Sequence, residues 1–169
     1  MTGLGILRPD RERQSASVTV ATASVEDNSI KTWRISRLGN VWTPLHEVRL
    51  GLDGSGDLLS STTLATHPSG LLAVGLKDGH ILVFDAFTGA VLERLKAHAS
   101  EVWDLALCGP VVISSSRDKT VAIHNLARSR GLEASTAPSP VFSYSSGWVL
   151  RLKLSPSRVS TGTCGPPRG

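Results

Sequence analysis

A histidine, a serine and an aspartate, the three residue types of a serine hydrolase, fall close together in the sequence as His98, Ser114 and Asp118. In such an enzyme the serine hydroxyl attacks the substrate, the histidine takes its proton and the aspartate orients the histidine. Ser114, however, lies in an apolar run that begins at Val111, and no Gly-x-Ser-x-Gly elbow exposes a nucleophile. We therefore expect a structural role for these residues, no catalytic residue and no enzymatic activity.

The sequence also predicts no metal site and no cofactor. Cys108 and Cys164 have no metal-ligand residue at useful spacing, and the glycine-rich stretch 51–56 is not followed by the Gly-Lys-Ser/Thr of a phosphate-binding loop. The histidines are spread along the chain without the short paired spacing that brings ligands together. They are His46, His67, His80, His98 and His124.

The elements that would position these side chains are strands. With 40% hydrophobic and 19% charged residues, the chain can bury a core, and its apolar runs are short, rich in β-branched residues and separated by polar turns. Three segments repeat one pattern: a turn Asp, a β-branched residue three positions on and a ring six positions on. They are Asp27, Ile30 and Trp33; Asp78, Ile81 and Phe84; and Asp118, Val121 and His124.

The spacing of these repeats predicts the architecture. The rings are 51 and then 40 residues apart, and residues 51–56 read as a loop insertion that lengthens the first interval. A period of about 40–45 residues with four strands per unit is typical of a propeller blade. No segment sustains a helical period, so the sequence predicts an all-β fold.

The third repeat resembles a WD repeat. That family begins its unit with Gly-His and ends it with Trp-Asp, and Ala97-His98 and His124-Asn125 stand in those places here. Phe84-Asp85 keeps the final Asp of the second repeat, and Trp33-Arg34 keeps the Trp of the first. The resemblance covers about residues 18–163. It implies a WD-repeat β-propeller of about three and a half four-stranded blades, which is an incomplete ring.

The resemblance also implies a buried hydrogen-bond network in each blade. In the family, the turn Asp accepts from the His, which is linked to a strand Ser and then to the Trp. Here His124 replaces that Trp, and Ala23 and Val74 stand where the first two repeats would carry the Ser. The network is therefore expected only in part. Its implied members are His98, Ser114, Asp118, Asp27, Asp78 and Trp33.

Counting strands divides the chain into blades. Residues 1–17 form an N-terminal segment, in which Leu4–Leu7 is the only remnant of an innermost strand for a partial first blade at 18–50. The second and third blades span 58–95 and 98–145, a partial fourth blade spans 146–163, and 164–169 is a disordered tail. Seven blades of about 40 residues need about 280 residues, so we expect a truncated or fragmentary chain, or two copies that complete one ring.

The function implied by the resemblance is a non-enzymatic scaffold for protein–protein interaction, as a subunit, or a truncated subunit, of a multiprotein complex. Partners are expected on the face that carries the turns between second and third strands and the loops before the innermost strands. The candidate contacts are Glu26, Lys77, Arg117, Glu101, Trp103 and Trp148.

Two other functions stay open: a subunit of an RNA-associated complex, using the net charge of +4, and a substrate-recruiting subunit of a ubiquitin ligase. The longest apolar runs are far too short to span a membrane, and Arg8, Asp10 and Arg13 stand where a signal peptide would need its apolar core. The sequence thus predicts an intracellular protein of the cytoplasm or nucleus.

Overall fold

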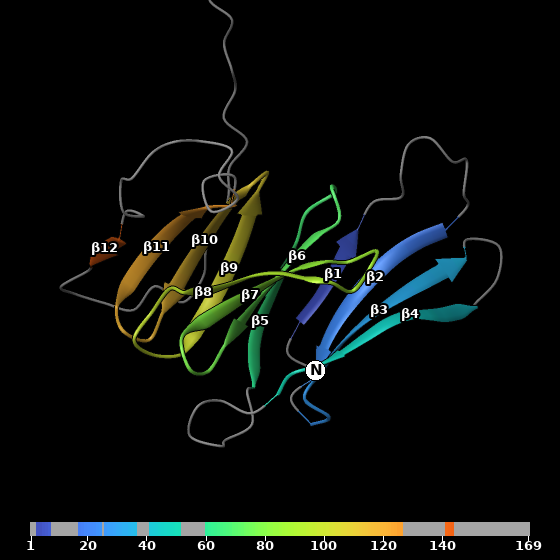
Figure 1. Cartoon of the computed structure of the whole chain (residues 1–169), viewed down its shortest axis with the longest axis horizontal. Helices are drawn as coiled ribbons and strands as arrows, with labels where there is room; N and C mark the ends of the chain where they lie inside the picture. The colour runs from blue at the N-terminus through green and yellow to red at the C-terminus, as the bar shows by residue number, and fades with distance from the viewer. Residues whose placement is uncertain are drawn as a thin grey trace, which may run out of the picture.

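The computed structural model describes residues 3–7, 17–24, 26–36, 41–51, 60–126 and 141–143, which form three four-stranded antiparallel sheets (Figure 1). Blade 1 consists of β1 (Gly3–Leu7), β2 (Ser17–Ser24), β3 (Ser29–Ser36) and β4 (Trp42–Arg49). Blade 2 consists of β5 (Ser61–Thr66), β6 (Leu71–Leu76), β7 (His80–Asp85) and β8 (Val91–Lys96). Blade 3 consists of β9 (Val102–Cys108), β10 (Val111–Ser116), β11 (Thr120–Asn125) and β12 (Val141–Ser143). The all-β prediction is confirmed.

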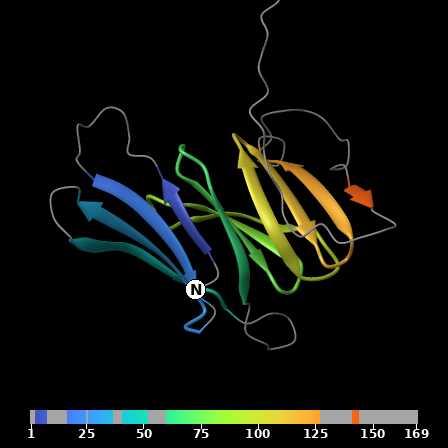
Figure 2. The ribbon, with the colours of Figure 1, turned by 180° about the vertical axis from the view of Figure 1, so that it is seen from behind.

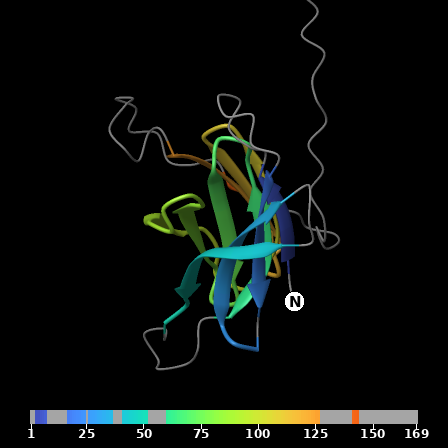
Figure 3. The ribbon, with the colours of Figure 1, turned by 90° about the vertical axis from the view of Figure 1, so that its right-hand side faces the viewer.

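The blades are arranged around their first strands. β1 contacts β5, and β5 contacts β9, so these three strands lie side by side while β4 and β12 lie at the outer edges (Figures 1 and 2). Figure 3 looks onto blade 1 and shows β4 crossing the direction of β1, as expected from the twist of a sheet. Among the described strands, blade 2 packs against both other blades but blades 1 and 3 share no extensive contact, so the described part is an open arc of a propeller.

The first blade includes the short N-terminal strand β1. β1 pairs with β2 along its whole length, with Gly3 opposite Ala23 and Leu7 opposite Thr19. The predicted remnant strand at Leu4–Leu7 is thus the innermost strand β1, and with it blade 1 has four strands. The predicted partial blade at 146–163 and the tail at 164–169 lie outside the described residues and stay predictions.

The hydrophobic core lies between the blades, in two clusters. β6 and β7 alternate: Leu72, Val74 and Phe84 belong to the cluster shared with blade 1, and Ala73, Ile81 and Val83 to the cluster shared with blade 3. Because both faces of blade 2 are buried, its two middle strands read in the sequence as nearly continuous apolar runs. Within the described ranges, no helix is long and apolar enough to cross a membrane.

Candidate functional site

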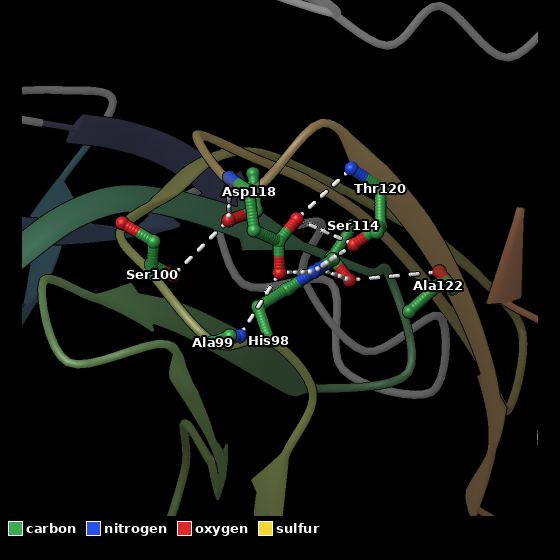
Figure 4. Close-up of polar contacts among 8 residues, drawn as sticks. His98, Ala99, Ser100, Ser114, Asp118, Thr120 and Ala122 are labelled. Atoms are coloured by element: carbon green, nitrogen blue, oxygen red, sulfur yellow. Dashed lines mark hydrogen bonds and ion pairs between the residues drawn. The ribbon is translucent and has the colours of Figure 1, made fainter. Parts of the chain in front are cut away.

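A buried histidine connects the loop between blades 2 and 3 to the strands of blade 3. His98 lies in the loop before β9 and is only 5% exposed. Its Nε2 is 2.8 Å from the Ser114 hydroxyl, its Nδ1 is 2.7 Å from the Thr120 hydroxyl, and Nδ1 also lies 3.3 Å from the Asp118 carboxylate (Figure 4). The structure thus brings His98, Ser114 and Asp118 together.

The Asp118 carboxylate ties the β10–β11 turn to the same loop. One oxygen accepts from the backbone N–H and the hydroxyl of Thr120, at 2.9 and 2.5 Å, and the other accepts from the Ala99 N–H at 2.9 Å. Burial alone would raise the pKa of Asp118, but the hydrogen bonds from Thr120 and Ala99 outweigh it and the pKa lies below its ordinary value. Asp118 is therefore ionised at neutral pH and acts as a fixed acceptor.

These bonds also define the tautomer of His98. The Thr120 hydroxyl donates to Asp118, so its oxygen accepts from His98 Nδ1–H, which leaves Nε2 to accept from the Ser114 O–H. Burial lowers the pKa of His98, and the nearby Asp118 carboxylate opposes this only in part. The neutral ring at pH 7 is the form that satisfies every neighbour.

Backbone bonds hold the loop before β9 on both sides. The His98 N–H donates to the Gly79 carbonyl of blade 2 at 3.1 Å, and the Arg117 N–H of blade 3 donates to the Glu101 carbonyl at 2.9 Å. The Ser116 hydroxyl adds a bond to the Ser100 carbonyl at 3.1 Å. Residues 97–101 are therefore a rigid connection between two blades.

The sequence analysis missed two members of this network, Thr120 and Ser116. Both flank Asp118 at two residues' distance, and the Asp118 N–H donates to the Ser116 hydroxyl at 3.1 Å. A Ser-x-Asp-x-Thr stretch is the signal that could have identified them, because Ser, Thr and Asp side chains bond to nearby backbone in turns.

The atoms of this network follow the order of a hydrolase relay, but the site cannot accept a substrate. Ser114 is fully buried, and its hydroxyl lies between His98 and the Ala122 carbonyl, 3.5 Å away. A nucleophile must reach the substrate carbon. What the arrangement does is satisfy buried polar groups and fix a loop, which is a structural role.

Blade 1 contains a related polar pair. Trp33 lies opposite Val20 in the β2–β3 register, and its Nε1 donates to the Thr22 hydroxyl at 3.1 Å. That hydroxyl in turn donates at 3.4 Å to the carbonyl of its cross-strand partner, Lys31. The prediction that Ala23 holds this place is wrong: the turn between β2 and β3 is one residue longer than that of blade 3, which moves the place to Thr22.

The same register identifies the equivalent pairs in the other blades. In blade 3, His124 lies opposite Val112, and the residue two positions on is Ser114. In blade 2, Phe84 lies opposite Leu72, and the residue two positions on is Val74. The same two positions are thus occupied by Trp33 and Thr22 in blade 1, by Phe84 and Val74 in blade 2, and by His124 and Ser114 in blade 3.

His124 is the member of these pairs whose polar atom is not satisfied. Its Nε2 is buried and has no hydrogen-bond partner within the described residues. Burial lowers the pKa of His124; the charge of His98 lowers it further, and the charge of Glu93 on β8 opposes this. A neutral His124 is therefore favoured at pH 7.

The other two turn aspartates do not join the His98 network. Asp27 is exposed and pairs with the Lys31 ammonium at 2.5 Å, which, with hydrogen bonds from nearby serines, lowers the pKa of Asp27. Asp78 accepts from the His80 N–H at 3.0 Å, and its other oxygen lies 2.9 Å from His80 Nδ1 and 3.5 Å from the Arg94 guanidinium. Each carboxylate stabilises its own turn.

The predicted partner-binding residues are placed as follows. Glu26, Lys77 and Arg117 are exposed, one in each of the turns between second and third strands. Glu101 is half-buried before β9 and is joined to Arg117 through the backbone. Trp103 is half-buried in β9, and Trp148 lies outside the described residues. No group of three or more potential metal ligands occurs in the described part of the chain.

The curated relatives of this chain are WD-repeat proteins, although no family profile matches it. WD repeat-containing protein VIP3 of Arabidopsis thaliana is 35% identical over 80 residues, which are 47% of this chain and 22% of that protein. WD repeat-containing protein 81 of Rattus norvegicus is 34% identical over 120 residues, 70% of this chain and 6% of that protein. The chain therefore matches less than a quarter of the length of either relative.

Solved structures give the same fold. The structure of U3-55K is 25% identical with a TM-score of 0.55, covering 75% of this chain and 36% of that one. The computationally designed Ika4 protein is 23% identical with a TM-score of 0.57, covering 91% of this chain and 79% of that one. With its three four-stranded blades and these relatives, this is a WD-repeat chain whose described residues form part of a β-propeller.

Proposed function

We propose that the chain is a non-enzymatic protein-interaction scaffold in an intracellular multiprotein complex, and that partners bind beside the loop before β9. The observation that carries this proposal is the fixation of residues 97–101 by backbone bonds to Gly79 of blade 2 and Arg117 of blade 3. A surface held in one conformation loses little entropy when a partner binds.

The charges around this loop support an acidic partner segment. Lys77 and Arg117 are exposed in the two adjoining turns, and Lys96 is exposed at the end of β8, directly before the loop. Asp78 is already engaged by His80 and Arg94, and Glu101 is half-buried. Arg117 is the anchor, because a guanidinium can hold a carboxylate through two parallel hydrogen bonds.

A peptide selection tests the proposal. The full chain would be used to select binders from a random peptide display library, and a labelled selected peptide would be titrated against the wild type and two variants. We expect acidic sequences, a loss of affinity of about tenfold or more in Arg117→Glu and Lys77→Glu, and a change within about twofold in the control Arg34→Glu, an exposed arginine of β3.

Selection of no acidic sequence, or equal losses in Arg117→Glu and Arg34→Glu, would count against this binding face. RNA is the alternative ligand that the same basic side chains could attract. Titration of a labelled single-stranded RNA separates the two: RNA binding that is tighter than peptide binding and falls steeply with salt would favour the RNA-associated role.

A further inference from the structure

His124 places a second titratable ring beside the His98 network, at the position where blade 1 has Trp33. We propose that His98 and His124 form an acid-sensitive latch, which holds the loop before β9 on blade 3 at neutral pH and releases it in mild acid. That acid also releases a bound partner rests on the proposed function. The opening of the loop in acid does not rest on the proposed function.

Ser114 bonds to His98, and its register position relative to His124 is that of Thr22 relative to Trp33. In blade 1 the Trp33 N–H donates to the equivalent hydroxyl, that of Thr22, and an indole N–H keeps its proton at every physiological pH. In blade 3 the Ser114 hydroxyl bonds to His98, while His124 Nε2 is buried without a partner in the described structure. Where blade 1 has the Trp33 N–H, a donor that stays neutral, blade 3 has His124, which can become charged.

Protonation of His98 removes its acceptor. The ring accepts the Ser114 O–H at Nε2, and a proton on Nε2 turns that acceptor into a donor. The Ser114 hydroxyl would have to rotate toward the Ala122 carbonyl, which lies at 3.5 Å, the edge of hydrogen-bond range. Nε2–H can then donate to the Ser114 oxygen, but the buried Ser114 O–H is left with only this long hydrogen bond.

Protonation of His124 destabilises the closed latch because it places a charge in a buried site and next to the ring of His98. The charged groups that face the two rings are Asp118 from the β10–β11 turn toward His98, Glu93 of β8 toward His124, and each ring toward the other. Asp118 and Glu93 favour the charged rings, but burial opposes charge more strongly at both histidines. Two charged rings would also repel one another.

Mild acid favours the open state of the latch. Both histidines have a pKa below the ordinary 6.5 in the folded chain, so the open state binds protons more readily than the closed state. The stability of the latch is complete above 6.5 and falls as pH decreases from 6.5 toward the lower pKa values of the closed state. Opening breaks the bonds of His98 to Ser114 and Thr120 and that of the Ala99 N–H to Asp118.

Hydrogen exchange of the full chain without a partner tests the latch. Exchange of residues 97–101 would be measured by mass spectrometry at about pH 7.5 and pH 5.5, corrected for intrinsic exchange rates. The variants are His124→Trp, which copies the Trp33 position, and His124→Phe, which copies Phe84 and has no titratable group. Blade 1 residues 29–36 serve as the internal reference.

We expect the wild-type loop to lose about tenfold protection or more at pH 5.5, both variants, which keep only His98 of the two titratable rings, to lose clearly less, and the reference strand to stay protected. Equal acid sensitivity in the wild type and His124→Trp, or none in the wild type, would overturn the latch. If a variant misfolds, titration of the wild-type histidine rings by NMR decides: pKa values at or above 6.5 would also overturn it. If the loop opens in acid as expected but the chain selects no acidic peptide, the proposed function is contradicted and the latch is not.

Discussion

Trp33 Nε1 lies 3.1 Å from Thr22 Oγ1 and donates a hydrogen bond to it. The same two positions hold Phe84 and Val74 in blade 2 and His124 and Ser114 in blade 3. Three blades with one backbone register thus use three chemistries at one place: a neutral polar pair, an apolar pair and a titratable pair. The polar pair and the titratable pair each lead to a prediction.

The polar pair of blade 1 predicts an asymmetric response to substitution at Thr22. Thr22→Val keeps the shape but leaves the Trp33 N–H without its acceptor, so we expect a loss of about 1–2 kcal/mol in the free energy of unfolding. Thr22→Ser keeps the hydroxyl and should cost less. Urea unfolding followed by circular dichroism measures both, and equal losses would show that the hydrogen bond does not stabilise the blade.

The titratable pair predicts that Ser114 matters for stability and not for catalysis. Ser114→Ala leaves His98 Nε2 without its donor inside a buried site, and we expect a loss of about 1–3 kcal/mol. Hydrolysis of p-nitrophenyl acetate should be no faster with the wild type than with the variant. Activity that disappears in a folded Ser114→Ala variant would contradict the structural role.

The turn of blade 2 predicts that Gly79 cannot carry a side chain. Gly79 has φ +88°, and a Cβ there would fall against the His98 carbonyl oxygen. Gly79→Ala should therefore cost more than the roughly 1–2 kcal/mol of the left-handed backbone conformation alone, and it should weaken the hydrogen bond from the His98 N–H to the Gly79 carbonyl. The matched control is Gly109→Ala, since Gly109 also has a positive φ, +58°, but open space around it. Thermal unfolding with similar losses in both variants would rule out the contact with His98.

The carboxylate of the network predicts a second acid range, below that of the histidines. The pKa of Asp118 is lowered on folding, so its stabilisation is complete above its ordinary value of 3.8 and is lost as pH falls below it. The difference in stability between the wild type and Asp118→Asn should be largest near neutral pH and shrink below pH 3.8. A difference that is constant from neutral pH to pH 3 would contradict this assignment.

Much of the fold could be predicted from the sequence because its signals are local. The polar turns at Asp27, Asp78 and Asp118 separate short β-branched runs, and each turn does join the second and third strands of a blade. The register within blade 1 could not be predicted in this way. Aligning the repeats on the turn Asp gives Ala23 the position of Ser114. The turn of blade 1 has one additional residue, which shifts β2 by one place, so Thr22 takes that position and Ala23 points to the opposite face of the sheet.

Only those residues of the blade 3 network that are far apart in the sequence could be predicted. His98, Ser114 and Asp118 follow from the resemblance to WD repeats, whereas Thr120 and Ser116 act through short contacts that depend on the turn geometry. The close approach of Gly79 to the His98 carbonyl likewise depends on how two separate loops are placed in the folded chain. Such contacts have no periodic signal.

The two faces of blade 2 have a mechanical consequence. One seam of the arc, between blades 1 and 2, is filled by side chains such as Leu72, Val74 and Phe84 and weakens on cooling, as apolar packing does. The other seam also contains an apolar cluster, but it is spanned by the loop of His98 and is therefore sensitive to protons. Cooling is therefore expected to weaken the apolar packing of both seams, whereas mild acid is expected to act only at the seam with blade 3, through the proposed latch.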